Sequence, residues 1–200
     1  MAQRQPSHYR TLASLSRINL LHELQQHGSQ TIGKLAKATG LHHNTAREHL
    51  HRLIDAGFVS SEPIPATAKG RPTILYSAGS AQSGEQRTNL ARKPLPLREV
   101  NGKMAAQREQ LGVLDSHMLR CGFDAITEVG SQQVVTHDCP FAELARKNPQ
   151  VCQVHFELAK DILQQVDGPV RARSLRPFFT ESDCVLDLDL GTDQTGASES

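Results

Sequence analysis

The chain has 200 residues, of which 38% are hydrophobic and 22% are charged. This apolar content is sufficient to build a core, so it excludes wholesale disorder. No apolar run approaches the roughly 18 residues of a membrane span, and the first nine residues (MAQRQPSHY) lack the apolar core of a secretory signal. We therefore expect a soluble, cytoplasmic protein of one or two domains.

The net charge of +1 conceals an uneven distribution of charge along the chain. Residues 1–77 carry nine Lys and Arg against four Asp and Glu, together with seven of the ten His. Residues 103–200 carry nine Lys and Arg against fifteen Asp and Glu. A basic N-terminal third beside an acidic C-terminal half is typical of a nucleic-acid-binding domain joined to a second module.

Three segments near the N-terminus carry apolar residues at helical spacing. The first is 14–27, which Gly28 stops, and the second is a short helix from Thr31 to Gly40. The third runs over 41–56, and its predicted buried face consists of Ala46, Leu50, Leu53 and Ile54. Two short strand patterns follow, over 58–60 and 74–76, and flank a loop that contains Pro63, Pro65, Gly70 and Pro72. Three helices followed by a two-stranded hairpin is the order of elements in a winged helix-turn-helix.

The opposite face of the third helix carries the side chains that a recognition helix presents to DNA. Asn and Arg make bidentate hydrogen bonds to adenine and guanine edges in the major groove. The predicted DNA-contacting residues of this helix are His42, His43, Asn44, Thr45, Arg47, Glu48, His51 and Arg52. In the loop of the hairpin, Lys69 and Arg71 can meet phosphates or enter the minor groove. A helical bundle with a solvated basic face is the alternative, and the ordered combination of helix pattern and Gly-Arg-Pro wing favours DNA.

The segment 41–59 (LHHNTAREHLHRLIDAGFV) with Gly70-Arg71-Pro72 resembles the ArsR-like winged-helix regulators of bacteria. The resemblance covers roughly residues 14–77. It implies a bacterial transcriptional regulator that binds double-stranded DNA.

Residues 78–102 are rich in Gly, Ser, Gln and Pro and are predicted to form a linker. A helical pattern returns from about Arg98 to Arg120. One face of this helix repeats every seven residues and would form the seam of a coiled coil. The seam consists of Met104, Gln107, Leu111, Leu114, Met118 and Cys121. Two heptads are too few for a coiled coil, so burial within its own domain and pairing across a dimer both stay open.

The remaining segment alternates strand and helix patterns. Strands are predicted over 123–127, 134–137, 170–178 and 184–190, with a short helix over 141–146 and a longer one from Pro149 on. The last ten residues are predicted to be a disordered tail. The predicted fold class is therefore α+β, with a winged helix-turn-helix (1–77), a linker (78–102), a dimerisation helix within a C-terminal sensor domain (103–190) and a tail (191–200).

The four cysteines, at 121, 139, 152 and 184, do not form a disulfide framework, because the chain is neither short nor secreted. Cys152 and His155 are three residues apart, so both point from one face of a helix. A loop Cys139, a helical Cys152 and a later Cys184 can converge on one metal ion or cluster. A free Cys is also commonly a small buried hydrophobe. Cys121, at a helix end, is predicted to pack in the core.

The pattern Cys-Pro-Phe, then twelve residues to Val-Cys with a following His, then a distant Cys, is similar to the C-terminal domain of SufR-type iron–sulfur repressors. That family places four Cys in the domain, and the third position falls here in 164–168, which contains no Cys. The resemblance implies that Cys139, Cys152 and Cys184 hold a [4Fe–4S] cluster. His155 is the first candidate for the fourth ligand, followed by His137, Asp138 and Asp183. The resemblance further implies that the cluster-bound form represses genes of iron–sulfur assembly.

The cysteine pattern also suits two other functions. Three Cys and one His also suit tetrahedral zinc, and a thiol redox switch needs only two Cys. Catalysis is disfavoured, because Arg146 stands at Cys-x6-Arg and not at the Cys-x5-Arg of thiol phosphatases, and no Ser/His/Asp signature, P-loop or GxGxxG is present. We expect a homodimeric regulator, and no enzyme, whose two winged helices bind a near-palindromic operator.

Overall fold

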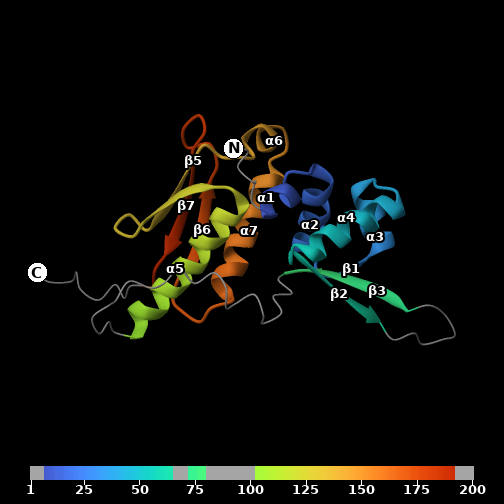
Figure 1. Cartoon of the computed structure of the whole chain (residues 1–200), viewed down its shortest axis with the longest axis horizontal. Helices are drawn as coiled ribbons and strands as arrows, with labels where there is room; N and C mark the ends of the chain where they lie inside the picture. The colour runs from blue at the N-terminus through green and yellow to red at the C-terminus, as the bar shows by residue number, and fades with distance from the viewer. Residues whose placement is uncertain (1–6, 65–71, 80–101, 192–200) are drawn as a thin grey trace, which may run out of the picture.

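The structure, a computed structural model, describes residues 7–64, 72–79 and 102–191 (Figure 1). The N-terminal elements are α1 (Ser7–Leu12), α2 (Leu15–His27), β1 (Gln30–Thr31), α3 (Ile32–Thr39), α4 (His43–Asp55), β2 (Val59–Ile64) and β3 (Thr73–Ala78). The C-terminal elements are α5 (Gly102–Cys121), β4 (Asp124–Glu128), β5 (Gln133–His137), α6 (Ala142–Lys147), α7 (Gln150–Gln164), β6 (Arg171–Arg176) and β7 (Cys184–Asp189).

The N-terminal elements form a winged helix-turn-helix, as predicted. Helices α2, α3 and α4 pack on one another around Leu21, Leu35 and Leu50, which are fully buried. The wing is an antiparallel sheet with the strand order β1-β3-β2. The alternative of a helical bundle without a wing is therefore excluded.

The hairpin strands are longer than the sequence pattern predicted, because Pro63 lies within β2 and not in the loop. Pro63 is opposite Ile74 of β3. A proline has no N–H to donate to a sheet and is tolerated on an edge strand. β2 is such an edge strand, since it pairs with β3 alone.

The C-terminal elements form a four-stranded antiparallel sheet with the order β4-β5-β7-β6. α7 packs on β6, and α5 packs on α7 and β4. All four strands and all three helices of this part agree with the predicted pattern, apart from small differences at their ends. The fold class is α+β.

The seam of α5 is buried within its own chain over its C-terminal half. Leu114, Met118 and Cys121 are buried, whereas Met104 at the start of the helix is 49% exposed. Gln110 is fully buried beside this seam. Its Nε2 donates to the carbonyl oxygens of Leu163 (2.7 Å), Val166 (3.2 Å) and Val170 (3.3 Å), and its Oε1 accepts from the N–H of Val170 at 2.7 Å. Gln110 therefore ties α5 to the end of α7 and the start of β6.

The N- and C-terminal elements share one hydrophobic core. α2 packs along α7, and α1 packs on α5. Two hydrogen bonds cross the first of these contacts, from Gln25 Nε2 to the carbonyl oxygen of Val154 (3.5 Å) and from Gln150 Nε2 to Asn19 Oδ1 (3.2 Å). Figure 1 shows α5 and α7 with the sheet on one side and α1 and α2 on the other. A movement of α7 would therefore displace α2, the helix that packs along it.

Nearly all of the predicted linker (78–102) and of the predicted tail lies outside the described residues, so the domain boundaries stay predictions. None of the helices in the described ranges combines the length and the apolar character that crossing a membrane requires.

Replacing Gln110 with Leu is expected to destabilise the protein by about 2 kcal/mol, because the N–H of Val170 and the carbonyl of Leu163 then lose their buried partner. Urea unfolding followed by circular dichroism measures the change. Gln107→Leu is the matched control, since Gln107 is half-buried and its bond to Leu190 is long, at 3.3 Å. Equal stability of the two variants would contradict the assigned role of Gln110.

Candidate functional site

The predicted DNA-contacting face of α4 is fully exposed. Its buried face consists of Ala46, Leu50 and Leu53, all at 0% exposure. The side chains exposed on the other face are His42, His43, Asn44, Thr45, Arg47, Glu48, His51 and Arg52. The structure thus presents these eight side chains to solvent, and their individual DNA contacts stay predictions.

The turn between α3 and α4 sets the position of the exposed face. Gly40 adopts the left-handed conformation (φ 67°), and its N–H donates to the carbonyl of Ala36. A side chain at this position would be strained, which explains the Gly. After the turn, His42 caps α4, since its Nδ1 accepts from the N–H of Asn44 at 3.4 Å. These contacts expose the first turn of α4, where recognition helices contact bases.

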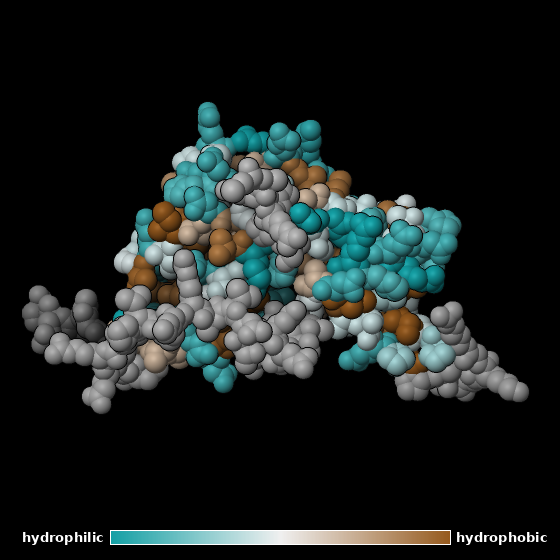
Figure 2. Space-filling model, in the orientation of Figure 1, coloured by the Kyte–Doolittle hydropathy of each residue, from teal (hydrophilic) through white to brown (hydrophobic). Residues whose placement is uncertain are grey.

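Basic side chains lie on the exposed face of α4 and beside it. Arg47 contacts the ring of His43 at 3.4 Å on the exposed face. Burial together with the charges of Arg17 and Arg52 lowers the pKa of His49. Figure 2 shows hydrophilic side chains over much of the helix-turn-helix end of the molecule. The basic side chains among them suit contact with a polyanion.

The two predicted wing contacts cannot be placed. The described part of β2 ends at Ile64 and the chain resumes at Pro72, so Lys69 and Arg71 lie outside the described residues. Their contacts with DNA stay predictions.

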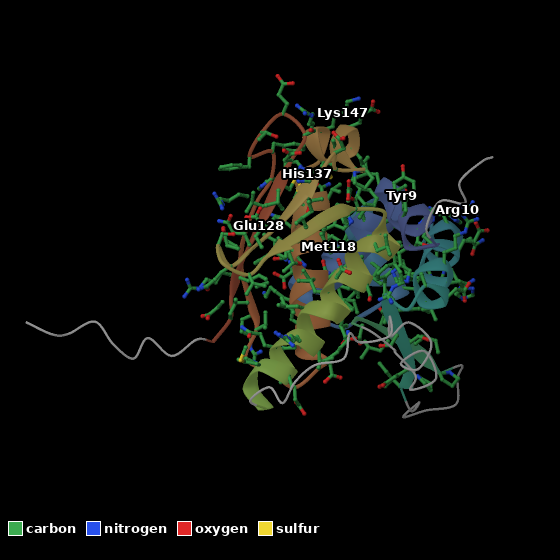
Figure 3. The ribbon with its side chains drawn as sticks, turned by 60° about the vertical axis from the view of Figure 1, so that its left-hand side comes forward. Tyr9, Arg10, Met118, Glu128, His137 and Lys147 are labelled. Atoms are coloured by element: carbon green, nitrogen blue, oxygen red, sulfur yellow. The ribbon has the colours of Figure 1, made fainter. Side chains whose placement is uncertain are left out.

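The three predicted cysteine ligands come from three elements and line one cavity. Cys139 follows β5, Cys152 lies in the first turn of α7, and Cys184 begins β7. Pairing of Thr136 with Cys184 places the end of β5 beside the start of β7. The N–H of Cys139 then donates to the carbonyl of Ser182 at 3.1 Å, which holds the loop against β7. In Figure 3, the label of His137 marks this end of the sheet.

The cavity has a volume of about 40 Å³. Its lining is mostly apolar and includes Met118, Phe123, Phe141, Phe156 and Leu186. The thiol of Cys139 donates to the sulfur of Cys184, which lowers the pKa of Cys184 to about 6. Burial and the charge of Cys184 raise the pKa of Cys152 to about 11. One of the three thiols is therefore already disposed to ionise, as a metal ligand must be.

His155 lines the same cavity and carries a free ring nitrogen. Its Nδ1–H donates to the carbonyl of Val151 at 2.8 Å, which fixes the tautomer, and its Nε2 is buried without a partner among the described residues. Phe141 and Phe123 pack on the ring with centroids at 4.5 Å and 5.2 Å. Burial lowers the pKa of His155 to about 4, so the ring is neutral at neutral pH. A neutral, oriented imidazole with one unpaired nitrogen is the form that ligates metals.

The other candidates for the fourth ligand have different environments. His137 and Asp183 pair with each other at 3.4 Å (Nδ1 to Oδ1), and the His137 side chain is 43% exposed. Asp138 has a positive φ of 45°. Neither His137, Asp138 nor Asp183 lines the cavity. The geometry therefore favours His155 among the four.

A second group of potential ligands was not predicted. His8, His117 and Cys121 place their ligating atoms within 4.8 Å of one another. Among the described residues, no other three potential ligands are gathered in this way. Cys121 is buried, as predicted, but beside His117 at 3.6 Å. The spacing of His117 and Cys121, four residues apart on one helix, is visible in the sequence, whereas the approach of His8 is not.

Acidification is expected to destabilise the metal-free protein through His155. Its pKa of about 4 in the folded state lies below the ordinary 6.5, so the unfolded chain takes up the proton first as the pH falls. The contribution of His155 to stability is fully present above pH 6.5 and is lost below it by about 1.4 kcal/mol per pH unit until about pH 4. Urea unfolding at a series of pH values should therefore show a shallower slope for His155→Gln. His51→Gln, at an exposed position, should keep the wild-type slope, and a slope unchanged in both variants would contradict the prediction.

Comparison with known proteins identifies the N-terminal part. Residues 12–62 match the family model described as "Helix-turn-helix domain". No curated protein matches the chain. The crystal structure of Bacillus subtilis PadR in complex with operator DNA has a TM-score of 0.30 and 12% identity, and the alignment covers 77% of this chain and 100% of that one. The family match and the observed wing together show that the chain carries a winged helix-turn-helix domain, the architecture of DNA-binding regulators.

Proposed function

We propose that this protein is a homodimeric transcriptional repressor whose operator affinity is set by a [4Fe–4S] cluster. The observation that carries the proposal is the cavity beside α7, which three thiols and a buried, unpaired imidazole nitrogen line together. Cys139, Cys152 and Cys184 would hold the cluster, with His155 as the fourth ligand. Such a cluster supplies an iron that reacts with oxygen or nitric oxide.

The cysteine pattern supports a cluster over zinc, because Cys-Pro-Phe, a following Val-Cys and a distant Cys resemble SufR-type iron–sulfur repressors. Three Cys and one His also suit tetrahedral zinc. The contact between Cys139 and Cys184 favours a second candidate, a thiol switch in which these two form a disulfide.

Seating a four-iron cube in a cavity of about 40 Å³ would require the Cys139 loop and the first turn of α7 to separate. The backbone beside Cys139 is strained, with a φ of 45° at Asp138. Outward movement of the Cys139 loop would break the hydrogen bond from its N–H to the carbonyl of Ser182.

Movement of α7 reaches the DNA-binding helices through α2. Gln25 and Asn19 of α2 hydrogen-bond to α7, and α2 packs on both α3 and α4. In a dimer, a shift of this kind changes the separation of two recognition helices, and half-sites recur about 34–36 Å apart per turn of DNA. A coupling of about 1–3 kcal/mol suffices for a 5–150-fold change in affinity.

Replacing Arg47 with Ala is expected to weaken operator binding by about 5–150-fold. This is the effect of losing one bidentate contact to a base or one charged contact to a phosphate. Fluorescence anisotropy at moderate salt with a genomic operator fragment measures the affinity. The matched control is Arg173→Ala, because Arg173 is equally exposed on β6, away from α4. Equal affinity of the Arg47 variant and wild type would refute the recognition role of α4.

Anaerobic purification should yield a brown protein with iron and acid-labile sulfide. Single Ser substitutions at Cys139, Cys152 and Cys184 should each remove both, because a cube held by two thiolates is labile, while Cys121→Ser retains them. About one zinc per colourless chain that Cys152→Ser removes would support a zinc sensor at this cavity instead. A metal-free protein whose DNA affinity follows formation of a Cys139–Cys184 disulfide would support the thiol switch.

A further inference from the structure

His8, His117 and Cys121 form a compact group between the two halves of the molecule. His8 comes from α1, and His117 and Cys121 lie one turn apart on α5. Their ligating atoms all lie within 4.8 Å of one another, and Cys121 Sγ is 3.6 Å from His117 Nε2. Two segments more than a hundred residues apart in the chain thus aim three metal-ligating atoms at one point.

Two members of the group are buried, and the third has a buried, unpaired nitrogen. His117 is 2% exposed and Cys121 is fully buried. His8 Nδ1 is buried without a partner in the described part of the chain. Burying polar atoms without hydrogen bonds costs free energy that an apolar residue at the same position avoids. Core packing alone therefore does not explain two imidazoles and a thiol at one point.

The surrounding contacts hold α1 in place over α5. The ring of His8 packs edge-on against Phe58 with a centroid distance of 4.9 Å. Tyr9, the next residue, packs on Phe141 at 5.2 Å and fits over Gly122, where an added Cβ would stand 3.5 Å from the Tyr9 ring. Figure 3 labels Tyr9 and Met118 on the two helices of this contact. The packing of His8 on Phe58 and of Tyr9 on Phe141 thus fixes the position of α1 over the group.

We propose that His8, His117 and Cys121 bind a transition-metal ion of the zinc class. Two imidazoles and one thiolate are ligands that zinc accepts, and three protein ligands leave a fourth position open. Burial keeps both imidazoles neutral, since it lowers the pKa of His8 to about 4 and of His117 to about 3. Only the Cys121 thiol must lose its proton on binding. Burial raises the pKa of this thiol to about 12, although the charge of Arg120 opposes the rise, so the bound metal must displace the proton.

The metal would join α1 to α5 and so connect the DNA-binding head to the C-terminal elements. The site is separate from the cysteine cavity, because none of its three ligands lines that cavity. The proposal therefore does not depend on an iron–sulfur cluster.

Cobalt(II) titration of the full-length chain tests the site. The background carries Ser at Cys139, Cys152 and Cys184, is stripped with a chelator, and is checked for folding by circular dichroism. We expect one equivalent of cobalt to bind with a cobalt–thiolate charge-transfer band, and zinc to displace it. Cys121→Ser should abolish the band, whereas His27→Gln, an exposed histidine of α2, should keep it.

His8→Gln provides a test that spares the core, because His8 lies near the start of the chain and is only half-buried. In the same background, it should weaken cobalt binding at least tenfold. Zinc should raise the melting temperature of the background protein and have a smaller effect on His8→Gln. Absence of a cobalt–thiolate band in the folded background, or a band that survives Cys121→Ser, would overturn the proposal.

Discussion

The packing of α7 between two parts of the molecule is the constraint on which the remaining structure depends. One side of α7 packs on the sheet and contributes Cys152 and His155 to the cavity, while the helix also packs along α2 of the DNA-binding head. Gln110 fixes α5 to the end of this helix by buried hydrogen bonds. Because protein interiors are close-packed, a change at the cavity cannot be absorbed by α7 alone and is passed to its neighbours.

Much of the fold was predictable, because strong periodicity identifies helices whose apolar face must be buried. α2, α4 and α7 follow this rule. On α4 the predicted Ala46, Leu50 and Leu53 are buried, whereas the predicted Ile54 is only half-buried. The short α1 and β1 were not predicted. α1 has six residues, too few to establish a helical period, and exists because Leu12 and Tyr9 pack against distant segments. β1 has only two residues and is defined by its pairing with β3.

Part of the candidate site follows from local helical geometry, and the rest depends on tertiary packing. The placement of Cys152 and His155 on one face of α7 follows from helical geometry. Their approach to Cys139 and Cys184 depends on the pairing of β5 with β7, which no local pattern specifies. Cys121 was expected to be buried, and it is, but its neighbour His8 arrives through tertiary packing of α1.

The two proposed ligand groups both involve α5. Met118 lines the cysteine cavity, while the adjacent His117 belongs to the group shared with α1. Successive residues on a helix point about 100° apart, since one turn takes 3.6 residues. A shift or rotation of α5 that widens the cavity therefore also displaces His117 relative to His8. Within the described residues, α1–α5 and α2–α7 are the helix pairs that join the head to the C-terminal elements, so the state of one group bears on the geometry of the other.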